Sequence, residues 1–312
     1  MFWIGDKLME DCNGMKHVIY TAIVGQYEQI IQPIVIHLDF DYVLFTDIDI
    51  KEEYVGVWQI RKIPYHNSDN TRVARWVKTH PEQLLGNYTD SIWIDANLQI
   101  LSEDFYDYVY KHIKSNVLVS SMWHNQRNCI YDEMAAVAYY ELEKEYVIID
   151  WLRFLLKEQY PQHNGLFETG VLFRNHSSDI VAKMDNLWWS CIDNYSRRDQ
   201  LSFNYVLWKY NIECPYFISD TENVRNTTCI KYNAHNNPKT RKMSSSKMNF
   251  VFINYYNNLF PASPNNIEKV KAIYLKIAKS PYPHFYLRGL GQIYRIPSQV
   301  KSLVRKLVQL LS

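Results

Sequence analysis

Short apolar runs that stop at a polar residue or a glycine are the feature that most constrains the fold. HVIYTAIVG (17–25), DYVLFTD (41–47) and SIWID (91–95) are rich in β-branched and aromatic residues, which favour strands. The third run has the core IWI, which leaves no polar face, so that strand has to be covered on both sides. Because a helical pattern at 68–85 separates these runs, we predict an α/β domain with a mostly parallel, mixed sheet and flanking helices.

The remaining elements are predicted from apolar spacing and from helix and turn signals. Ser68 or Asp69 can cap the helix at 68–85, and Pro81 marks its end or a break. The long helical region at 129–160 is expected to be interrupted near Val147 to Asp150. Further strands are expected at 57–60, 116–123 and 165–176, and an edge strand that Pro215 limits is expected at 212–218. Further helices are expected at 177–196 and 197–211.

The composition changes near residue 233, and this change indicates how the chain is divided. The stretch 233–250 is polar, basic and poor in apolar residues, as mobile loops are. We therefore predict a folded domain at 1–232, a mobile polar loop at 233–250 and a helical extension at 251–312. The last helix, 297–312, combines an apolar stripe with basic residues on its other faces. That pattern is typical of peripheral binding to an anionic membrane, or of packing against the domain or a second subunit.

Charge and cysteine content limit the partners and the location. The chain has 34 Lys and Arg against 33 Asp and Glu, and a net charge of +1 provides no basic field for nucleic acid. The 5 cysteines lie far apart and form no paired metal-ligand spacing, which indicates reduced thiols. The acidic N-terminal stretch does not resemble a secretory signal, and no apolar run is long enough to span a membrane. We expect a cytoplasmic protein that can reside at the inner face of the cell membrane.

Two polar side chains, Asp95 and Asn97, follow the strand that contains IWI. In open α/β sheets, ligands bind beyond the carboxyl ends of the strands. A carboxylate and an amide oxygen two residues apart can both face one divalent cation, whose remaining positions are open to water and phosphate oxygens. The same D-x-N pattern also fits a simple turn, in which Asp95 caps the next turn.

Basic residues on the helix just upstream strengthen the case for a ligand site. Arg72, Arg75 and Lys78 recur every three residues, which keeps them near one helix face in a geometry suited to a diphosphate. The alternative is a solvated face that pairs with neighbouring acidic residues.

Other candidate residues lie farther along the chain. Glu168 and Thr169 precede Gly170, where a strand edge can approach a ligand closely because glycine has no side chain. Asp199 and Gln200 begin a helix, and Asp199 is an active-site carboxylate, part of a capping box with Ser196, or both. His235 and Lys239 can contact a metal or phosphate, or can be exposed without a role. The segment 123–133 contains polar residues that can contact substrate or form a local salt-bridge cluster: His124, Arg127, Asp132 and Glu133.

Seven segments in order resemble a known family, the glycosyltransferase-like domain found in plant proteins of pectin and mucilage synthesis and in bacterial surface-polysaccharide loci. They are IYTAIVGQYEQI, DYVLFTD, TRVARWVKTHP, SIWIDANLQI, WHNQRNCIYDE, ETGVLFRNH and WWSCIDNYSRRDQLSFNYVLW. The resemblance covers about His17 to Trp208 and implies a GT-A fold.

The resemblance also implies roles for individual residues. Asp95 and Asn97 would occupy the place of the DxD metal motif, with His235 as a loosely matching late metal ligand. Asp199 would lie near the anomeric carbon. Residues around the uridine would include Thr21, Ala22, Val24, Gly25 and Asp47, and Arg72, Arg75 and Lys78 would lie near the diphosphate. On their own sequence context, Glu168 is a candidate for the acceptor side, and Gly170, Gln200 and Lys239 are further candidates for donor binding.

The expected activity is that of a metal-dependent glycosyltransferase of the hexosyltransferase type. Mn²⁺ or Mg²⁺ would bridge Asp95 and the diphosphate of a nucleotide sugar, which we expect to be a UDP-sugar. The acceptor would be a glycan, including a lipid-linked one, in the synthesis of a cell-surface polysaccharide such as capsule or lipopolysaccharide, and related transferases favour retention of configuration. The alternatives are a metal-dependent phosphodiesterase or nucleotide-sugar hydrolase, and a non-catalytic carbohydrate-binding protein.

Overall fold

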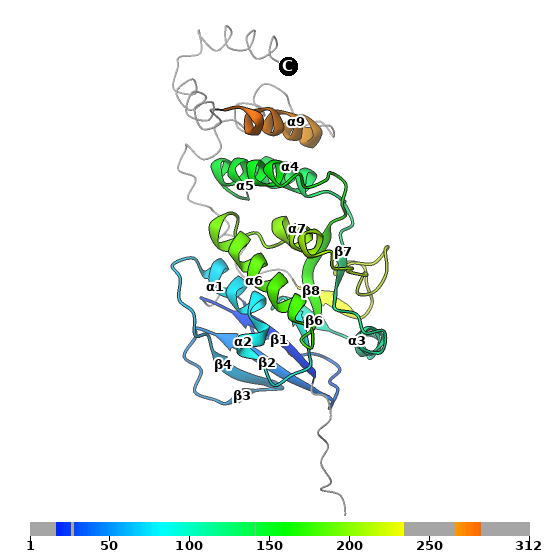
Figure 1. Ribbon diagram of the computed structural model, residues 1–312. Coiled ribbons are helices and arrows are strands. Elements are labelled where there is room, and N and C mark those ends of the chain that lie inside the picture. The colour runs from blue at the N-terminus through cyan, green and yellow to red at the C-terminus, as the bar shows by residue number, and fades with distance from the viewer. Residues whose placement is uncertain (1–16, 26–27, 141, 234–265, 282–312) are drawn as a thin grey trace, which may run out of the picture.

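The computed structural model describes residues 17–25, 28–140, 142–233 and 266–281. This part of the chain is built around a central seven-stranded sheet (Figure 1). The strand order is β3-β4-β2-β1-β5-β8-β7, with β4, β2, β1 and β5 parallel to one another and β8 antiparallel to both β5 and β7. The strands are β1 His17–Ile23, β2 Phe40–Thr46, β3 Tyr54–Val55, β4 Trp58–Lys62, β5 Asp90–Ile94, β7 Val119–Trp123 and β8 Phe167–Asn175. A separate antiparallel pair consists of β6 Leu98–Ile100 and β9 Ile230–Tyr232. The predicted α/β fold, a mostly parallel, mixed sheet with flanking helices, is confirmed.

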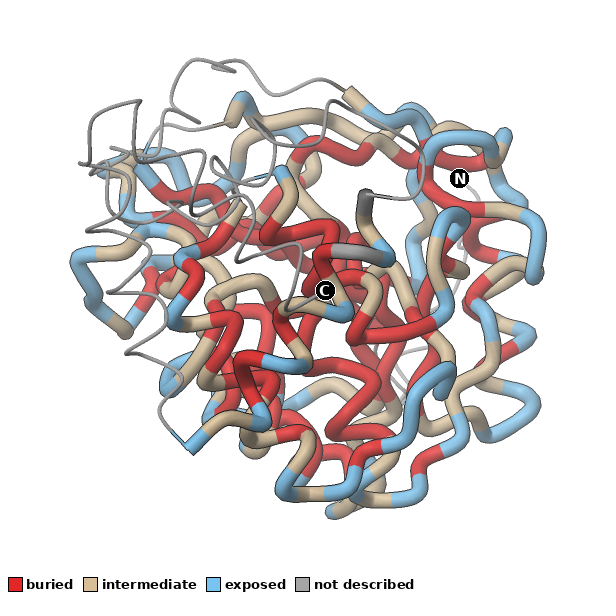
Figure 2. Tube along the Cα trace, turned by 90° about the horizontal axis from the view of Figure 1, so that it is seen from above, coloured by how far each residue is buried: buried red, intermediate tan, exposed pale blue. Residues whose placement is uncertain are grey.

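Helices cover both faces of this sheet because its central strands are apolar on both sides. All residues of β1 and β5 are buried. Val18 and Tyr20 belong to one core, whereas Ile19 and Ile23 belong to a second core on the opposite face. Seen from above, buried residues fill the interior of the trace (Figure 2). This alternation is the period of two that a strand imposes.

The helices are distributed unequally between the two cores. Most of them contribute to the first core, whereas α3 contributes Phe105 and Val109 to the second. The helices among the described residues are α1 Asn70–Thr79, α2 Pro81–Leu84, α3 Asp104–Lys114, α4 Ile130–Tyr139, α5 Glu145–Lys157, α6 Asp179–Asn194, α7 Gln200–Tyr210 and α9 Asn266–Lys279. None of these helices is both long and apolar enough to cross a lipid bilayer.

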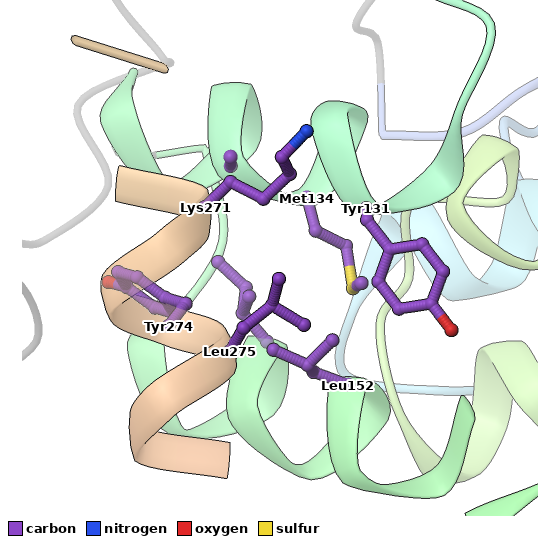
Figure 3. A pocket seen from close by; sticks show the side chains of 8 residues that line it. Tyr131, Met134, Leu152, Lys271, Tyr274 and Leu275 are labelled. Atoms are coloured by element: carbon purple, nitrogen blue, oxygen red, sulfur yellow. The ribbon is translucent and has the colours of Figure 1, made fainter. Parts of the chain in front are cut away.

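Helix α9 packs on α4 and α5, on their side away from the sheet (Figure 1). Figure 3 shows the contact, where Tyr274 and Leu275 of α9 lie beside Met134 of α4 and Leu152 of α5. The gap left between these side chains has a volume of about 10 Å³, which is at the lower limit for one water molecule. This pocket is therefore a packing defect and not a ligand site.

Several sequence predictions need correction. The helical region at 129–160 breaks between Tyr139 and Glu145, and Val147 to Asp150 lie inside α5, because Ile148 and Ile149 are buried in the core. Tertiary packing here outweighs the low helix propensity of β-branched residues. The segment 212–218 forms a single bridge, Ser121 to Tyr216, and not a strand. Helix α3 was not predicted, although its buried residues follow a helical spacing.

A buried ion pair fixes β8 against α6. Arg174 Nη1 donates to Asp185 Oδ1 at 2.8 Å, and the guanidinium also donates to the Tyr20 hydroxyl of β1. Arg174 is fully buried and Asp185 is 3% exposed. Because neither charge can reach water, each depends on the other.

We expect Asp185→Asn to lower the free energy of unfolding by about 3–5 kcal/mol, because it leaves the Arg174 guanidinium buried without its counter-ion. Denaturant unfolding measures this effect. The double variant Arg174→Met with Asp185→Leu removes both charges and should lose less stability than Asp185→Asn. A double variant that is less stable than the single one would contradict this interpretation of the pair.

Candidate active site

The loops that follow β1, β2 and β5 begin at one edge of the sheet, because these parallel strands end there. The Gly25 N–H donates to Asp47 Oδ1 at 2.9 Å, which joins the first two loops. Gly25 has a φ of +67°, and a Cβ at this position would lie 2.1 Å from Asn70 Nδ2 at the start of α1. Glycine is therefore required where β1, β2 and α1 meet.

A pocket with a volume of about 190 Å³ lies beside this junction. Its lining comes from the ends of β2 and β4 and from the first residues of α1, and it includes Asp47, Tyr65, Asn67 and Asn70. The Tyr65 ring stacks on Trp76, with ring centroids 5.2 Å apart and planes 7° apart. Of these lining residues, only Asp47 was predicted from the sequence. Tyr65 and Asn67 lie in the irregular segment between β4 and α1, and Asn70 is the first residue of α1. Nothing in the spacing of these residues indicates which of them face a pocket.

A buried charge cluster joins α1, β8 and α7 next to the end of β5. Lys78 Nζ, fully buried, lies 2.5 Å from Asp199 Oδ2 and donates to the Thr169 carbonyl at 2.6 Å. Arg75 Nε lies 3.0 Å from Asp199 Oδ1, and Thr169 Oγ1 donates to Asp199 Oδ2 at 3.0 Å. The Lys78 ammonium also lies 5.4 Å from the centre of the Trp93 ring. Both oxygens of Asp199 are thus occupied.

Asp199 stays ionised in this cluster. Burial alone would raise the pKa of its carboxyl, but Arg75 and Lys78 hold that pKa well below its usual range. Asp199 precedes the first residue of α7, yet its side chain makes no capping bond. Ser196 Oγ instead donates to Glu143 and accepts from the Arg198 N–H. The capping-box alternative is therefore wrong, and the carboxylate belongs to the charge cluster.

Asp95 is the carboxylate of this region that reaches solvent, with 31% of its side chain exposed. Its Oδ1 accepts from Trp93 Nε1 at 2.7 Å and lies 3.8 Å from Lys78 Nζ and 3.9 Å from Arg75 Nη1. Its N–H donates to the Gly170 carbonyl at 2.8 Å. The end of β5 is therefore held against β8, with Asp95 between the cluster and the solvent.

Asn97 lies at the junction of the small sheet with the end of β5. It is 6% exposed, and its Nδ2 donates to the Asn233 carbonyl at 3.1 Å. Its own carbonyl accepts from the Asn233 N–H at 2.9 Å. The amide nitrogen is thus used in a structural contact, which leaves the amide oxygen as the group that can face a ligand.

Glu168 lies in β8, close enough to Asp95 for their charges to interact. Arg225 Nη1 donates to its Oε1, and the Glu168 side chain is 15% exposed. Burial raises the pKa of this carboxyl, and the negative charges of Asp95 and Glu133 act in the same direction, whereas Arg225 opposes them. Arg225 was missed in the sequence, because it lies in an irregular segment after α7.

Three polar residues of 123–133 form a cluster near Glu168, whereas the fourth, Asp132, pairs with Lys271 of α9. Arg127 Nε lies 2.5 Å from Glu133 Oε2, and His124 Nε2 lies 3.7 Å from the same oxygen. Burial, together with the Arg127 charge, lowers the pKa of His124 to about 4. His124 is therefore neutral at neutral pH, and the carboxylate of Glu133 is balanced mainly by Arg127.

The remaining predicted site residues lie apart from this centre. Arg72 donates to the Ile192 and Tyr195 carbonyls at the end of α6 and does not contact the charge cluster. Gln200 is half-buried at the start of α7. Three residues of β1 and its end have side chains buried in or beside the sheet: Thr21, Ala22 and Val24. His235, Lys239 and the terminal helix 297–312 lie outside the described residues.

The chain matches one protein family and resembles several solved structures. The family model of the TOD1/MUCI70 glycosyltransferase-like domain matches residues 2–235. Similar solved structures include the WbbM bifunctional glycosyltransferase in its apo form, at 10% identity and a TM-score of 0.39, over 67% of this chain and 40% of that one. Another is mouse xyloside xylosyltransferase 1, also apo, at 6% identity and a TM-score of 0.38, over 70% of this chain and 97% of that one. No protein with a curated description matches significantly.

We expect Asp199→Asn to lower the free energy of unfolding by about 3–5 kcal/mol at pH 7, because Lys78 and Arg75 lose their counter-ion. The pKa of Asp199 is depressed on folding, so its contribution is present above the pKa of an unfolded Asp and is lost as the pH falls. The stability difference between the two proteins should therefore shrink below about pH 4.

Denaturant unfolding at several pH values measures this difference, and the exposed Asp193→Asn on α6 is the matched control. A difference that grows toward acid pH would refute the assignment of a permanently ionised Asp199.

Proposed function

Because the chain belongs to the TOD1/MUCI70 glycosyltransferase-like family, we propose that it transfers a sugar from a nucleotide-diphosphate sugar to a glycan acceptor at this site. The observation that carries the proposal is the position of Asp95. It is a partly exposed carboxylate at the end of a central parallel strand, on the same edge as the pocket that contains Asp47. This edge is where α/β sheets bind nucleotides.

The pocket suits the nucleoside half of the donor. Asp47, Asn67 and Asn70 provide hydrogen-bonding groups for a base or ribose, and Tyr65 provides an aromatic surface. β1 separates β2 from β5, so the loops of Asp47 and Asp95 lie two strand spacings apart, about 10 Å. A nucleoside diphosphate can span this distance, and we propose uridine as the nucleoside, as the sequence resemblance implies.

The charge balance at the cluster supports metal dependence. Lys78 and Arg75 carry two positive charges, and Asp199 and Asp95 carry two negative charges within 4 Å of them. The basic residues are therefore already neutralised and leave no free charge for a diphosphate. The oxygens of Asp95 and Asn97 fit a hard cation such as Mn²⁺ or Mg²⁺. When bound, that cation would stabilise the charge on the departing nucleoside diphosphate.

We assign different roles to the two proposed catalytic carboxylates. Asp199, whose oxygens are both occupied, holds Lys78 and Arg75 in place beside the donor and does not attack the sugar. Glu168 keeps a raised pKa next to Asp95, which suits a group that binds an acceptor hydroxyl and exchanges its proton. Retention of the anomeric configuration is part of the proposal, on the basis of the resemblance alone.

The two rival functions have less support. A phosphodiesterase or hydrolase usually surrounds its metal with several carboxylates and histidines. Among the described residues, Asp95 belongs to no group of three or more His, Cys, Asp or Glu side chains with metal-ligand spacing. A carbohydrate-binding surface would need a group of exposed aromatic rings. Trp93, Trp151 and Trp188 are fully buried, and the exposed rings are tyrosines on separate elements, such as Tyr54 of β3, Tyr146 of α5 and Tyr232 of β9. The acceptor that we propose is a cell-surface glycan, including a lipid-linked one, with 297–312 as the membrane-proximal segment.

We expect Asp95→Ala to reduce nucleotide release from a UDP-sugar at least about 100-fold and to abolish its dependence on Mn²⁺, because the bridging carboxylate is lost. A coupled nucleotide-release assay over a panel of donors, with and without chelator, measures both. The control is Asp193→Ala, an exposed carboxylate on α6. Unchanged metal-dependent turnover in Asp95→Ala would rule out the metal assignment.

For Glu168→Gln we expect kcat to fall about 100-fold with little change in the donor KM, because the acceptor loses its proton partner. In the wild type, the acid limb of the pH–rate profile should lie above the pKa of an ordinary Glu, because burial raises the pKa of Glu168. Glu213→Gln, at an exposed position, serves as the control. An equal loss in kcat and rise in donor KM would instead place Glu168 in the donor site.

A further inference from the structure

Three side chains that can ligate a transition metal meet at the start of α4. They are Cys129, Asp132 and His163, and one ligand atom from each lies within 4.8 Å of the others. Among the described residues, this is the one group of three or more His, Cys, Asp or Glu side chains with such spacing. None of the three belongs to the proposed donor site, whose acidic residues Asp47 and Asp95 follow β2 and β5.

Local structure explains why these residues converge. Cys129 directly precedes α4 and Asp132 lies in its first turn, so the two residues, three apart, occupy one face. His163 lies in the loop between α5 and β8. Two residues of this segment, Gln159 with a φ of +58° and His163 with a φ of +56°, have left-handed backbone conformations. They direct the loop toward the start of α4, where the His163 N–H donates to Cys129 Sγ at 3.3 Å.

Each ligand has a neighbour that fixes its position. The His163 N–H donates to the sulfur of Cys129, the residue that directly precedes α4. Lys271 Nζ of α9 lies 2.5 Å from Asp132 Oδ1, which leaves the second carboxylate oxygen to face an ion. Asn128 Oδ1 lies 3.3 Å from His163 Nδ1, where it either orients the imidazole or provides a fourth oxygen ligand. Such supporting contacts are typical of metal ligands.

We propose that Cys129, Asp132 and His163 form a Zn²⁺ site. A thiolate, an imidazole and a carboxylate suit the borderline-soft Zn²⁺, whereas Mg²⁺ and Mn²⁺ prefer oxygen ligands such as those of Asp95. On binding, the Cys129 thiol gives its proton to solvent and its sulfur binds the ion.

The position of the site indicates what bound zinc does. Cys129 is fully buried, whereas His163 is exposed, so the cluster lies between the core and the solvent. Zinc would tie the start of α4 to the loop before β8. These two segments lead directly to Glu133 and to Glu168. The site therefore holds together the acceptor side of the proposed active centre, although the proposal of zinc binding does not depend on that function.

Zinc titration of the full chain against a chromophoric chelator tests the proposal. The titration uses an Asp95→Ala background, so that zinc bound at the donor site does not contribute. We expect one zinc per chain, and at least about tenfold weaker binding in His163→Ala and in Cys129→Ser. Cys214→Ser, which alters a cysteine outside the cluster, should bind zinc like its parent.

Cobalt provides a second readout that depends on the sulfur ligand. The parent protein with Co²⁺ should show a thiolate-to-metal charge-transfer absorption that Cys129→Ser lacks. Because His163 is exposed, His163→Ala should fold, and zinc should raise the melting temperature of the parent more than that of this variant. Equal zinc affinity in the parent and in His163→Ala, or a Co²⁺ spectrum without a thiolate band, would overturn the proposal.

Discussion

The buried contact between Asp199, Lys78 and Arg75 is the interaction on which the arrangement of the site depends. Lys78 and Arg75 come from α1, and the Thr169 groups that complete the contact come from β8. Removing such charges from water costs several kcal/mol for each ion, so the cluster is tolerated only because each charge is paired and hydrogen-bonded. Once formed, it fixes α1, β8 and the start of α7 around the end of β5.

Three carboxylates near this cluster differ in chemistry because their surroundings differ. Asp199 is buried between two cations and stays ionised, whereas Asp95 keeps a partly exposed side chain at the same edge. Glu168 is mostly buried beside other acidic groups, and its pKa is raised. One can therefore serve as an anchor, one as a metal ligand and one as a proton-exchanging group. Enzymes commonly use two carboxyl groups whose surroundings give them different pKa values.

The sequence predicted the sheet better than the site. The apolar runs of β1, β2 and β5 predict buried parallel strands, because a strand without a polar face has few alternatives. Because Asp47 and Asp95 directly follow two of these runs, the same pattern predicts that both residues lie at one edge of the sheet.

Long-range contacts could not be predicted from spacing. Arg72, Arg75 and Lys78 share one pattern, yet Arg72 binds the end of α6 while the other two residues bind Asp199. Asp199 fitted a capping box equally well, because local spacing does not reveal a partner 121 positions away. The family resemblance supplied the DxD interpretation of Asp95 and Asn97, but the contact of Asn97 with Asn233 emerges only in three dimensions.

The proposed function requires that the diphosphate of a nucleotide sugar binds at Asp95 through a divalent cation. Calorimetric titration of UDP into the full chain, first with Mn²⁺ and then with a chelator, measures this binding. We expect one UDP to bind per chain, and its affinity to fall at least about tenfold when the metal is removed. Equal UDP affinity with and without the metal would contradict this requirement.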